Sequence, residues 1–151
     1  MNVKKAVVGV DHGGFTLKDR VVAHLKKSGI AVTDLGVFTE ESVDYTDIAT
    51  EVCATLIKED YDLAVLACGT GIGVSMAANK IAGVRCALVH DLFTAEMAAA
   101  HNHANALAFG GRVSYSVPVE SMLDTFFDTA PLGDRHDRRV RKLDGLIPNK
   151  T

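Results

Sequence analysis

The feature that most constrains this chain is an uncharged apolar run that stops at a cysteine and passes directly into a glycine-rich loop. The run spans residues 63–67 and is followed by Cys68. Glycine then occupies every second position, at Gly69, Gly71 and Gly73. With a helix-compatible stretch at residues 74–80, this pattern is typical of a buried parallel strand, a tight turn and a helix. We therefore expect Cys68 at the carboxyl end of a strand, the edge at which α/β sheets build their sites.

The same loop defines the chemistry open to Cys68. Glycines leave backbone N–H groups free to point into a pocket, and the start of the following helix adds positive potential. A thiol beside such a loop is biased toward the thiolate, which is the reactive form of cysteine. Cys68 is therefore a candidate to remove a proton from carbon or to attack carbon, while the loop holds the negative charge that results.

Composition sets the class of protein and excludes several partners. The chain has 151 residues, enough for one domain, and its 48% hydrophobic and 23% charged residues are ordinary for a soluble protein. A net charge of −3 gives no general attraction to nucleic acid or membranes, and no apolar run is long enough to span a bilayer. Three widely spaced cysteines, with neither a Cys-x-x-Cys motif nor a signal peptide, favour a reducing compartment, so we expect a cytoplasmic protein.

Strand-like and helix-like patterns alternate along the whole chain. We expect strands at residues 6–10, 30–32, 63–67, 84–89 and 106–109. We expect helices at residues 15–27, 48–58, 74–80, 94–101, 117–128 and 137–146. Such alternation favours a parallel sheet with helices on both faces. The expected architecture is a three-layer α/β/α, Rossmann-like sandwich with a five-stranded parallel sheet, formed by a single domain over residues 1–151.

Residues suited to binding and catalysis occur just after the expected strands. They are Asp11 and His12, then Cys68, then His90 and Asp91, and finally Arg112. Parallel strands have their carboxyl ends at one edge of the sheet, so we expect these groups to converge, with His90 and Asp91 in a supporting role. Cys53 and Cys86 fall inside a helix and a strand, and we expect both to be core residues.

Spacing excludes two other uses of a cysteine or a glycine loop. A cysteine phosphatase needs Cys-x5-Arg, but position 74 is Val74. A dinucleotide-binding module needs Gly-x-Gly-x-x-Gly after the first strand, whereas these glycines alternate and follow the third. His101 and His103 suggest a metal pair, yet no further ligand is spaced to complete a set. We expect neither a metal nor a cofactor.

A series of short motifs extends over nearly the whole chain. They are Asp11-His12-Gly-Gly-Phe-x-Leu-Lys, Asp44-Tyr45, Cys68-Gly-Thr-Gly-Ile-Gly, Ala78-Asn79-Lys80, Gly83-Val-Arg85, His101-Asn102 and Gly133-Asp-Arg135-His136-x-x-Arg139-Val140. In this order they resemble the type B ribose-5-phosphate isomerases of the ribose/galactose isomerase family. The resemblance runs from residue 8 to about residue 143.

The resemblance implies a Rossmann-like fold, a homodimer whose sites are shared across the subunit interface, and metal-free interconversion of an aldose phosphate and a ketose phosphate through an enediolate. Ribose 5-phosphate is the expected substrate, with allose 6-phosphate, galactose 6-phosphate or a tetrose phosphate as alternatives. A tetramer is the alternative assembly. A non-catalytic sugar-phosphate-binding protein is the rival from another class, but it would not need Cys68 and His101 together.

The resemblance also implies which residue performs each chemical step. It makes Cys68 the general base that moves a proton between C1 and C2 of the open-chain sugar. The oxyanion hole is the loop backbone at Gly69, Gly71, Ile72 and Gly73. His101 opens the sugar ring, Thr70 assists with its hydroxyl, and Asn102 holds hydroxyls or the enediolate. By residue type alone, Thr70 and His101 would be ordinary helix caps.

Substrate contacts follow from the same resemblance. Asp11 contacts a sugar hydroxyl or the ring oxygen, and Tyr45 lines the sugar pocket, where Thr46 replaces the usual proline. The phosphate group is held by His12, Arg112, Arg135 and Arg139. Arg135 and Arg139 are four residues apart, so they share one face of a basic helix at about residues 135–146 that completes the site. The other basic residues of that helix, Arg138, Arg141 and Lys142, are expected to face solvent.

Overall fold

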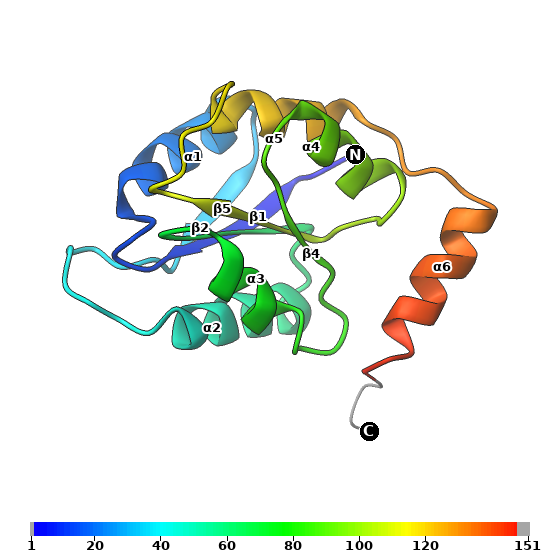
Figure 1. Ribbon diagram of the computed structural model, residues 1–151, viewed down its shortest axis with the longest axis horizontal. Helices are drawn as coiled ribbons and strands as arrows, with labels where there is room; N and C mark the ends of the chain where they lie inside the picture. Colours follow the sequence, from blue (N-terminus) through cyan, green and yellow to red (C-terminus); the bar gives the residue numbers. More distant parts are fainter. Residues whose placement is uncertain (1, 148–151) are drawn as a thin grey trace.

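A five-stranded, entirely parallel sheet forms the centre of the molecule (Figure 1). The computed structural model describes residues 2–147, so residues 1 and 148–151 of the expected single domain lie outside the described part. The strands are β1 (Lys5–Val10), β2 (Ala31–Asp34), β3 (Leu63–Cys68), β4 (Cys86–Leu88) and β5 (Ala106–Gly110). Their order in the sheet is β2-β1-β3-β5-β4.

Helices cover both faces of this sheet. They are α1 (Phe15–Lys27), α2 (Tyr45–Lys58), α3 (Ile72–Ala78), α4 (Leu92–Ala100), α5 (Val119–Asp128) and α6 (Arg135–Asp144). Figure 1 shows α1, α4 and α5 on one face, α2 and α3 on the other, and α6 standing to the side. The three-layer α/β/α, Rossmann-like prediction is therefore confirmed. Within residues 2–147, no helix combines the length and the apolar character needed to cross a bilayer.

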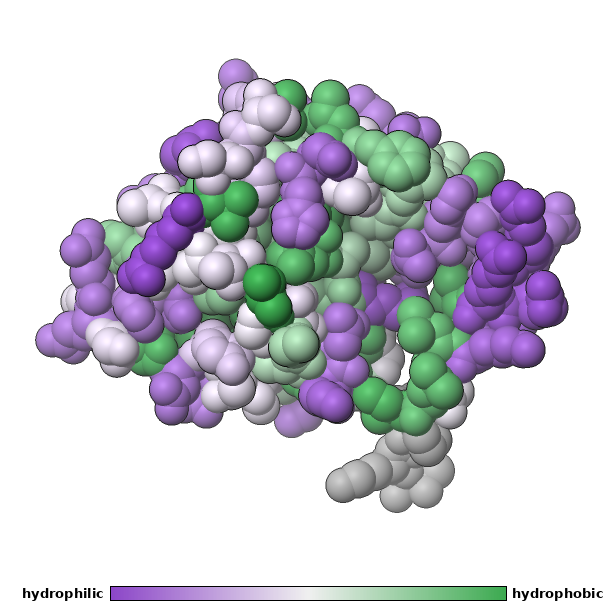
Figure 2. Space-filling view, viewed as in Figure 1, coloured by the Kyte–Doolittle hydropathy of each residue, from purple (hydrophilic) through white to green (hydrophobic). Residues whose placement is uncertain are grey.

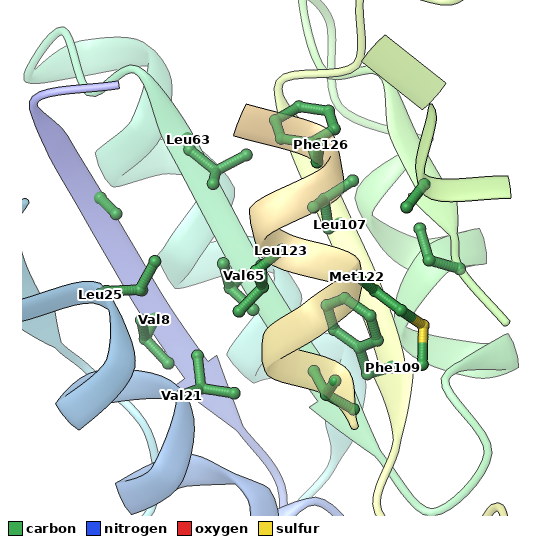
Figure 3. Packing of buried hydrophobic residues seen from close by; sticks show 14 of the residues in the cluster. Val8, Val21, Leu25, Leu63, Val65, Leu107, Phe109, Met122, Leu123 and Phe126 are labelled. Atoms are coloured by element: carbon green, nitrogen blue, oxygen red, sulfur yellow. The ribbon is translucent and has the colours of Figure 1, made fainter. Parts of the chain in front are cut away.

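The larger part of the core lies between the sheet and the helices α1, α4 and α5 (Figure 3). Val8, Val65 and Leu107 project from the three central strands into this layer and are almost completely buried. They pack with Leu25 of α1 and Phe126 of α5, neither of which is exposed to solvent. Because a strand buried on both faces needs apolar residues at successive positions, β3 reads in the sequence as one continuous apolar run.

Several element boundaries differ from the sequence prediction by one to three residues, and two of these differences have identifiable reasons. Helix α2 begins at Tyr45 rather than at residue 48, because the carbonyl of Asp44 already accepts the N–H groups of Asp47 and Ile48. Strand β4 is limited to Cys86–Leu88, although an apolar run of twice that length was expected. It is an edge strand that pairs only with β5, through three residue pairs, so its flanks at Arg85 and Val89 have a neighbour on one side only.

The sheet order makes the carboxyl ends of β1 and β3 a topological switch point. These two strands are neighbours, but β1 leads into α1 on one face whereas β3 leads into α3 on the other. The connections therefore diverge at the carboxyl ends of the two strands, where open α/β sheets form their ligand sites. Asp11 follows β1 and Cys68 ends β3, so both stand at this point.

We expect the same substitution to change the free energy of unfolding unequally at two adjacent phenylalanines of α5. Phe126 is fully buried, whereas Phe127 is only partly buried at the margin of the same cluster. We expect Phe126→Ala to lower the free energy of unfolding by about 3–5 kcal/mol, since it leaves a large cavity. Phe127→Ala is the matched control and should cost clearly less. Urea unfolding measures both, and equal losses would contradict this description of the core.

Candidate active site

Cys68 is the last residue of β3, and its side chain faces the turn that follows. The N–H of Gly71 donates a hydrogen bond to Cys68 Sγ at 3.1 Å. This donation depends on a left-handed backbone at Gly71, with φ of +78°, which glycine adopts without steric cost. The residue is only 5% exposed. The turn therefore aims a backbone N–H at the sulfur atom of Cys68.

The turns after β1, β3 and β5 pack backbone against backbone. A Cβ atom at Gly13 would lie 2.6 Å from the nitrogen of Gly69, closer than real contacts allow. A Cβ atom at Gly111 would similarly lie against the carbonyl oxygen of Gly13. Glycine at these positions therefore lets three turns meet in one place, and it brings the residues beside them together.

Asp11 shapes the turn after β1. Its Oδ1 atom accepts the N–H groups of Gly13, at 2.8 Å, and Gly14, at 3.1 Å. The residue is 5% exposed, and its own N–H donates to the carbonyl of Ala67 in β3. Asp11 thus links the carboxyl ends of β1 and β3. Both hydrogen bonds of the turn use Oδ1, so neither of them involves the second carboxylate oxygen, Oδ2.

The ring of His12 is oriented by the loop that follows β2. The N–H of Val43 donates to Nδ1 of His12 at 3.3 Å. Because Nδ1 accepts this bond, the proton of the neutral ring is on Nε2, the nitrogen that remains for a ligand. The loop over residues 35–44 therefore sets both the position and the tautomer of His12.

Tyr45 and Arg112 flank the glycine loop on either side. A Cβ atom at Gly73 would lie 2.8 Å from Cζ of Tyr45, so the phenol ring lies flat against that glycine. The guanidinium of Arg112 lies beside Gly69, where a Cβ atom would be 3.6 Å from it. Arg112 is exposed, and its guanidinium has no hydrogen bond or ion pair with the residues that the structure describes. It is a charge available to an anion.

Two amides of the glycine loop are already engaged. The N–H of Gly71 points at Cys68, and the N–H of Ile72 donates to the hydroxyl of Thr70 at 3.3 Å. The helix cap is Gly71 rather than Thr70, whose exposed hydroxyl instead folds back onto the loop. The predicted oxyanion hole is thus a preformed turn whose central amides face sulfur and hydroxyl oxygen.

These residues form one compact set, which we call the edge group: Asp11, His12, Tyr45, Cys68 to Gly73 and Arg112. His90 and Asp91 were expected beside it, but Asp91 is the cap of α4. Its carboxylate accepts the N–H of Thr94 at 2.7 Å, and these hydrogen bonds lower the pKa of Asp91. The expected supporting role of Asp91 is therefore replaced by a structural one.

The remaining predicted residues lie near the amino-terminal ends of the strands, opposite the carboxyl ends that carry Cys68. His101 ends α4, and Asn102 follows it, just before β5 begins. Cys68 instead pairs with Gly110, the last residue of β5. Since β5 has five residues, its two ends are about 13 Å apart. One chain therefore does not bring Cys68 and His101 into contact.

Helix α6 lies at the same end of the molecule as His101. The imidazole rings of His101 and His136 stack, with centroids 4.1 Å apart and planes 14° from parallel. Arg139, with His101, Asn102 and His136, borders a cavity of about 360 Å³. We call His101, Asn102, Arg135, His136 and Arg139 the helix group. The predicted site residues thus fall into two groups, each carrying cations suited to an anion.

Two contributors were missed by sequence reasoning. His136 belongs to a motif quoted from the sequence, but no role was predicted for it. It is 5% exposed, and its burial beside His101 and the arginines lowers its pKa. Tyr115 accepts the N–H of Gly110 at 2.7 Å through its hydroxyl, next to the strand end that carries Cys68. Burial raises the pKa of this phenol. Only spatial proximity identifies either residue, because no motif contains Tyr115 and nothing in the sequence pairs two histidines 35 positions apart.

The other cysteines and histidines have separate surroundings. Burial raises the pKa of the Cys53 thiol to about 12, and burial together with Cys53 raises the pKa of Cys86 as well. Both thiols therefore stay protonated. Cys53 is buried in the core as expected, whereas Cys86 is only partly buried at its margin. His103 contacts the carbonyl oxygen of Leu132 through Nε2. Within residues 2–147, no three His, Cys, Asp or Glu side chains gather as a metal site would require.

Sequence comparison places these features in a known family. Residues 6–143 match the model of the Ribose/Galactose Isomerase family. The chain is 37% identical to ribose-5-phosphate isomerase B of Escherichia coli, over 95% of this chain and 97% of the relative. It is 39% identical to ribose-5-P isomerase B of Listeria innocua, over 94% and 96%.

Solved structures agree with this assignment. Ribose-5-phosphate isomerase B of Clostridium thermocellum superposes with a TM-score of 0.90 at 39% identity, covering 94% of this chain and 96% of that one. A ribose 5-phosphate isomerase of Thermotoga maritima superposes with a TM-score of 0.89 at 41% identity, covering 96% and 99%. With sequence, fold and the cysteine–glycine turn in accord, the chain belongs to the ribose/galactose isomerase family of sugar-phosphate isomerases.

Proposed function

We propose that this protein interconverts ribose 5-phosphate and ribulose 5-phosphate through an enediolate, with the Cys68 thiolate as the general base. The observation that carries the proposal is the hydrogen bond from the Gly71 N–H to Cys68 Sγ, in a turn that also has the guanidinium of Arg112 beside it. The relatives named as ribose-5-phosphate isomerases support the choice of substrate.

Proton transfer is the step assigned to the edge group. Cys68 would take the proton from C2 of the open-chain aldose and return it to C1, which leaves negative charge on the sugar oxygens in between. Backbone N–H groups aimed at developing charge typically contribute about 10²–10³ in rate. Gly71 and Ile72 already donate within the loop, so the oxyanion role falls first on Gly69 and Gly73.

Phosphate binding would draw on both groups. Arg112 and the Nε2 atom of His12 come from the edge group, and Arg135 and Arg139 from the helix group. Guanidinium groups hold phosphate through paired, charge-assisted hydrogen bonds. A phosphate held by these four residues would fix the position of the reacting sugar carbons relative to Cys68.

Ring opening is assigned to the helix group and Thr70. Furanose phosphates are mostly closed, so a proton must be moved at the ring oxygen and the anomeric hydroxyl before C2 can be deprotonated. His101 is the acid/base for this step, and its stacking on His136 holds the ring in one orientation. Asn102 and the Thr70 hydroxyl supply hydrogen bonds to the sugar.

A homodimer would unite the two groups in one site. The edge group and the helix group stand at opposite ends of the strands within one chain, so the His101 that serves Cys68 would come from the second copy. Exposed apolar side chains on α3 and α4 support such an interface: Met76 is 65% and Phe93 is 66% exposed. We place the enzyme in the cytoplasm because its thiols are unpaired.

A panel of aldose phosphates tests this function. We expect the highest kcat/KM with ribose 5-phosphate among ribose 5-phosphate, allose 6-phosphate, galactose 6-phosphate and a tetrose phosphate. Cys68→Ala should lower kcat by roughly 10²–10⁴, the usual contribution of a general base. Cys53→Ala is the control and should retain turnover. Binding of sugar phosphate without any turnover would instead identify a non-catalytic binding protein.

Mixed dimers test whether the site is shared. Cys68→Ala and His101→Asn should each be nearly inactive as homodimers. Coexpression of the two variants should restore roughly a quarter of wild-type activity, because half of the dimers are mixed and each mixed dimer has one intact site of two. No recovery in purified mixed dimers would show that Cys68 and His101 do not act across the interface.

Alkylation distinguishes the three thiols. A thiol with a pKa of about 12, like that of Cys53, is ionised in about one molecule in ten thousand at pH 8. Iodoacetamide at pH 8 should therefore label Cys68 first, as measured by peptide mass spectrometry, and inorganic phosphate at high concentration should slow that labelling. Faster labelling of Cys53 or Cys86 would contradict the assignment of Cys68 as the thiolate.

A further inference from the structure

Helix α6 has little apolar contact with the rest of its own chain. Only His136 and Val140 of this helix are buried, and Leu143 near its end remains 45% exposed. Between α6 and the β4–α4 region lies a cavity of about 500 Å³, seen in Figure 2 as a hollow beside the hydrophilic surface of the helix. Polar contacts therefore have an unusually large part in setting the position of this helix.

The first of these contacts is made by His103. Its backbone is left-handed, with φ of +46°, a conformation that few residues other than glycine adopt. This turn sends the side chain toward the segment that leads into α6, where Nε2 contacts the carbonyl oxygen of Leu132 at 2.9 Å. On the other side of the ring, Nδ1 lies 3.8 Å from Oδ1 of Asp137. His103 therefore ties the end of α4 to the start of α6.

The second contact is made by Arg85. Its Nε–H donates to the carbonyl oxygen of His103 at 3.0 Å, which supports the left-handed turn. Its Nη1 atom donates to both carboxylate oxygens of Asp144, at 3.0 and 3.3 Å, near the far end of α6. The backbone N–H of Arg85 is itself held by the Oδ1 atom of Asn105. One anchored guanidinium thus links the His103 turn to the end of the helix.

We propose that this clasp, formed by Arg85, His103, Asp137 and Asp144, is a specificity device that sets the distance between the ring-opening His101 and the phosphate-binding arginines of α6. His101 and His103 are separated by a single residue, so whatever holds His103 to α6 also holds His101. An aldose phosphate with one more carbon places its phosphate farther from its reacting carbons. The clasp therefore favours an aldose phosphate of one carbon-chain length over one that is longer by a single carbon.

This inference rests on the proposed function and concerns positioning rather than chemistry, since no clasp residue is assigned a contact with substrate. A misplacement of about 1 Å at a catalytic group costs on the order of 10² in rate, so a modest shift of α6 is enough to select between sugars. The clasp pairs are partly exposed, with Asp144 at 42%, so each contributes a moderate restraint.

The test compares Asp144→Asn and His103→Asn with a control of the same kind. Asparagine tolerates the left-handed backbone at position 103, and Asp144 is on the surface, so both variants should fold. Asp124→Asn is the control, because it removes an exposed pair with His24 on α1, far from α6. For each protein, kcat/KM is measured with ribose 5-phosphate and with allose 6-phosphate, and hydrogen exchange is followed for the amides of α6.

We expect the ratio of the two kcat/KM values to fall by roughly twofold to fivefold in Asp144→Asn, and by more in His103→Asn. Exchange in α6 should accelerate in both variants, and Asp144→Glu should restore the ratio. The control should match wild type. An unchanged ratio in an active enzyme would overturn the clasp but leave the isomerase proposal standing. A wild type inactive on every aldose phosphate would instead overturn the proposed function.

Discussion

Close packing of three glycine turns is the constraint on which the rest of the site depends. The turns after β1, β3 and β5 approach so closely that Gly13 has no room for a Cβ atom against Gly69, nor Gly111 against Gly13. Because the backbones touch, the main chain at Cys68 and Arg112 is held in place without large side chains between the turns. The rigidity that a base and an anion site require therefore comes from main chain rather than from side-chain packing.

Helix α6 is held by a different principle. The central sheet is stabilised by buried residues such as Val8, Leu107 and Phe126, whereas α6 depends on ring stacking and on charged pairs. Polar restraints of this kind are weaker than core packing, but they have defined directions and distances. The molecule therefore combines a core, which carries the thiol at the end of β3 and His101 at the end of α4, with a separately positioned helix, which carries Arg139.

Local pattern was sufficient to predict most of the fold. An uninterrupted apolar run predicts a strand buried on both faces, and β3 occurs where that run ends at Cys68. The sequence pattern predicted the wrong boundaries where contacts with other parts of the chain determine where an element begins or ends. Strand β4 is short because it lies at the edge of the sheet, and α2 starts early because the Asp44 carbonyl captures two amides. Residue propensities do not encode the place of a strand in its sheet or the hydrogen bonds of one particular carbonyl.

The sequence by itself determined the alternation of strands and helices, the place of Cys68 at a strand end, and the glycine turn beside it, because each follows from residues close together in the chain. Only the tertiary structure decided which residues share a site. It separated His101 from Cys68, stacked His101 on His136, and turned Asp91 into a helix cap. These outcomes depend on strand order and on helix direction, which arise from packing between segments distant in sequence.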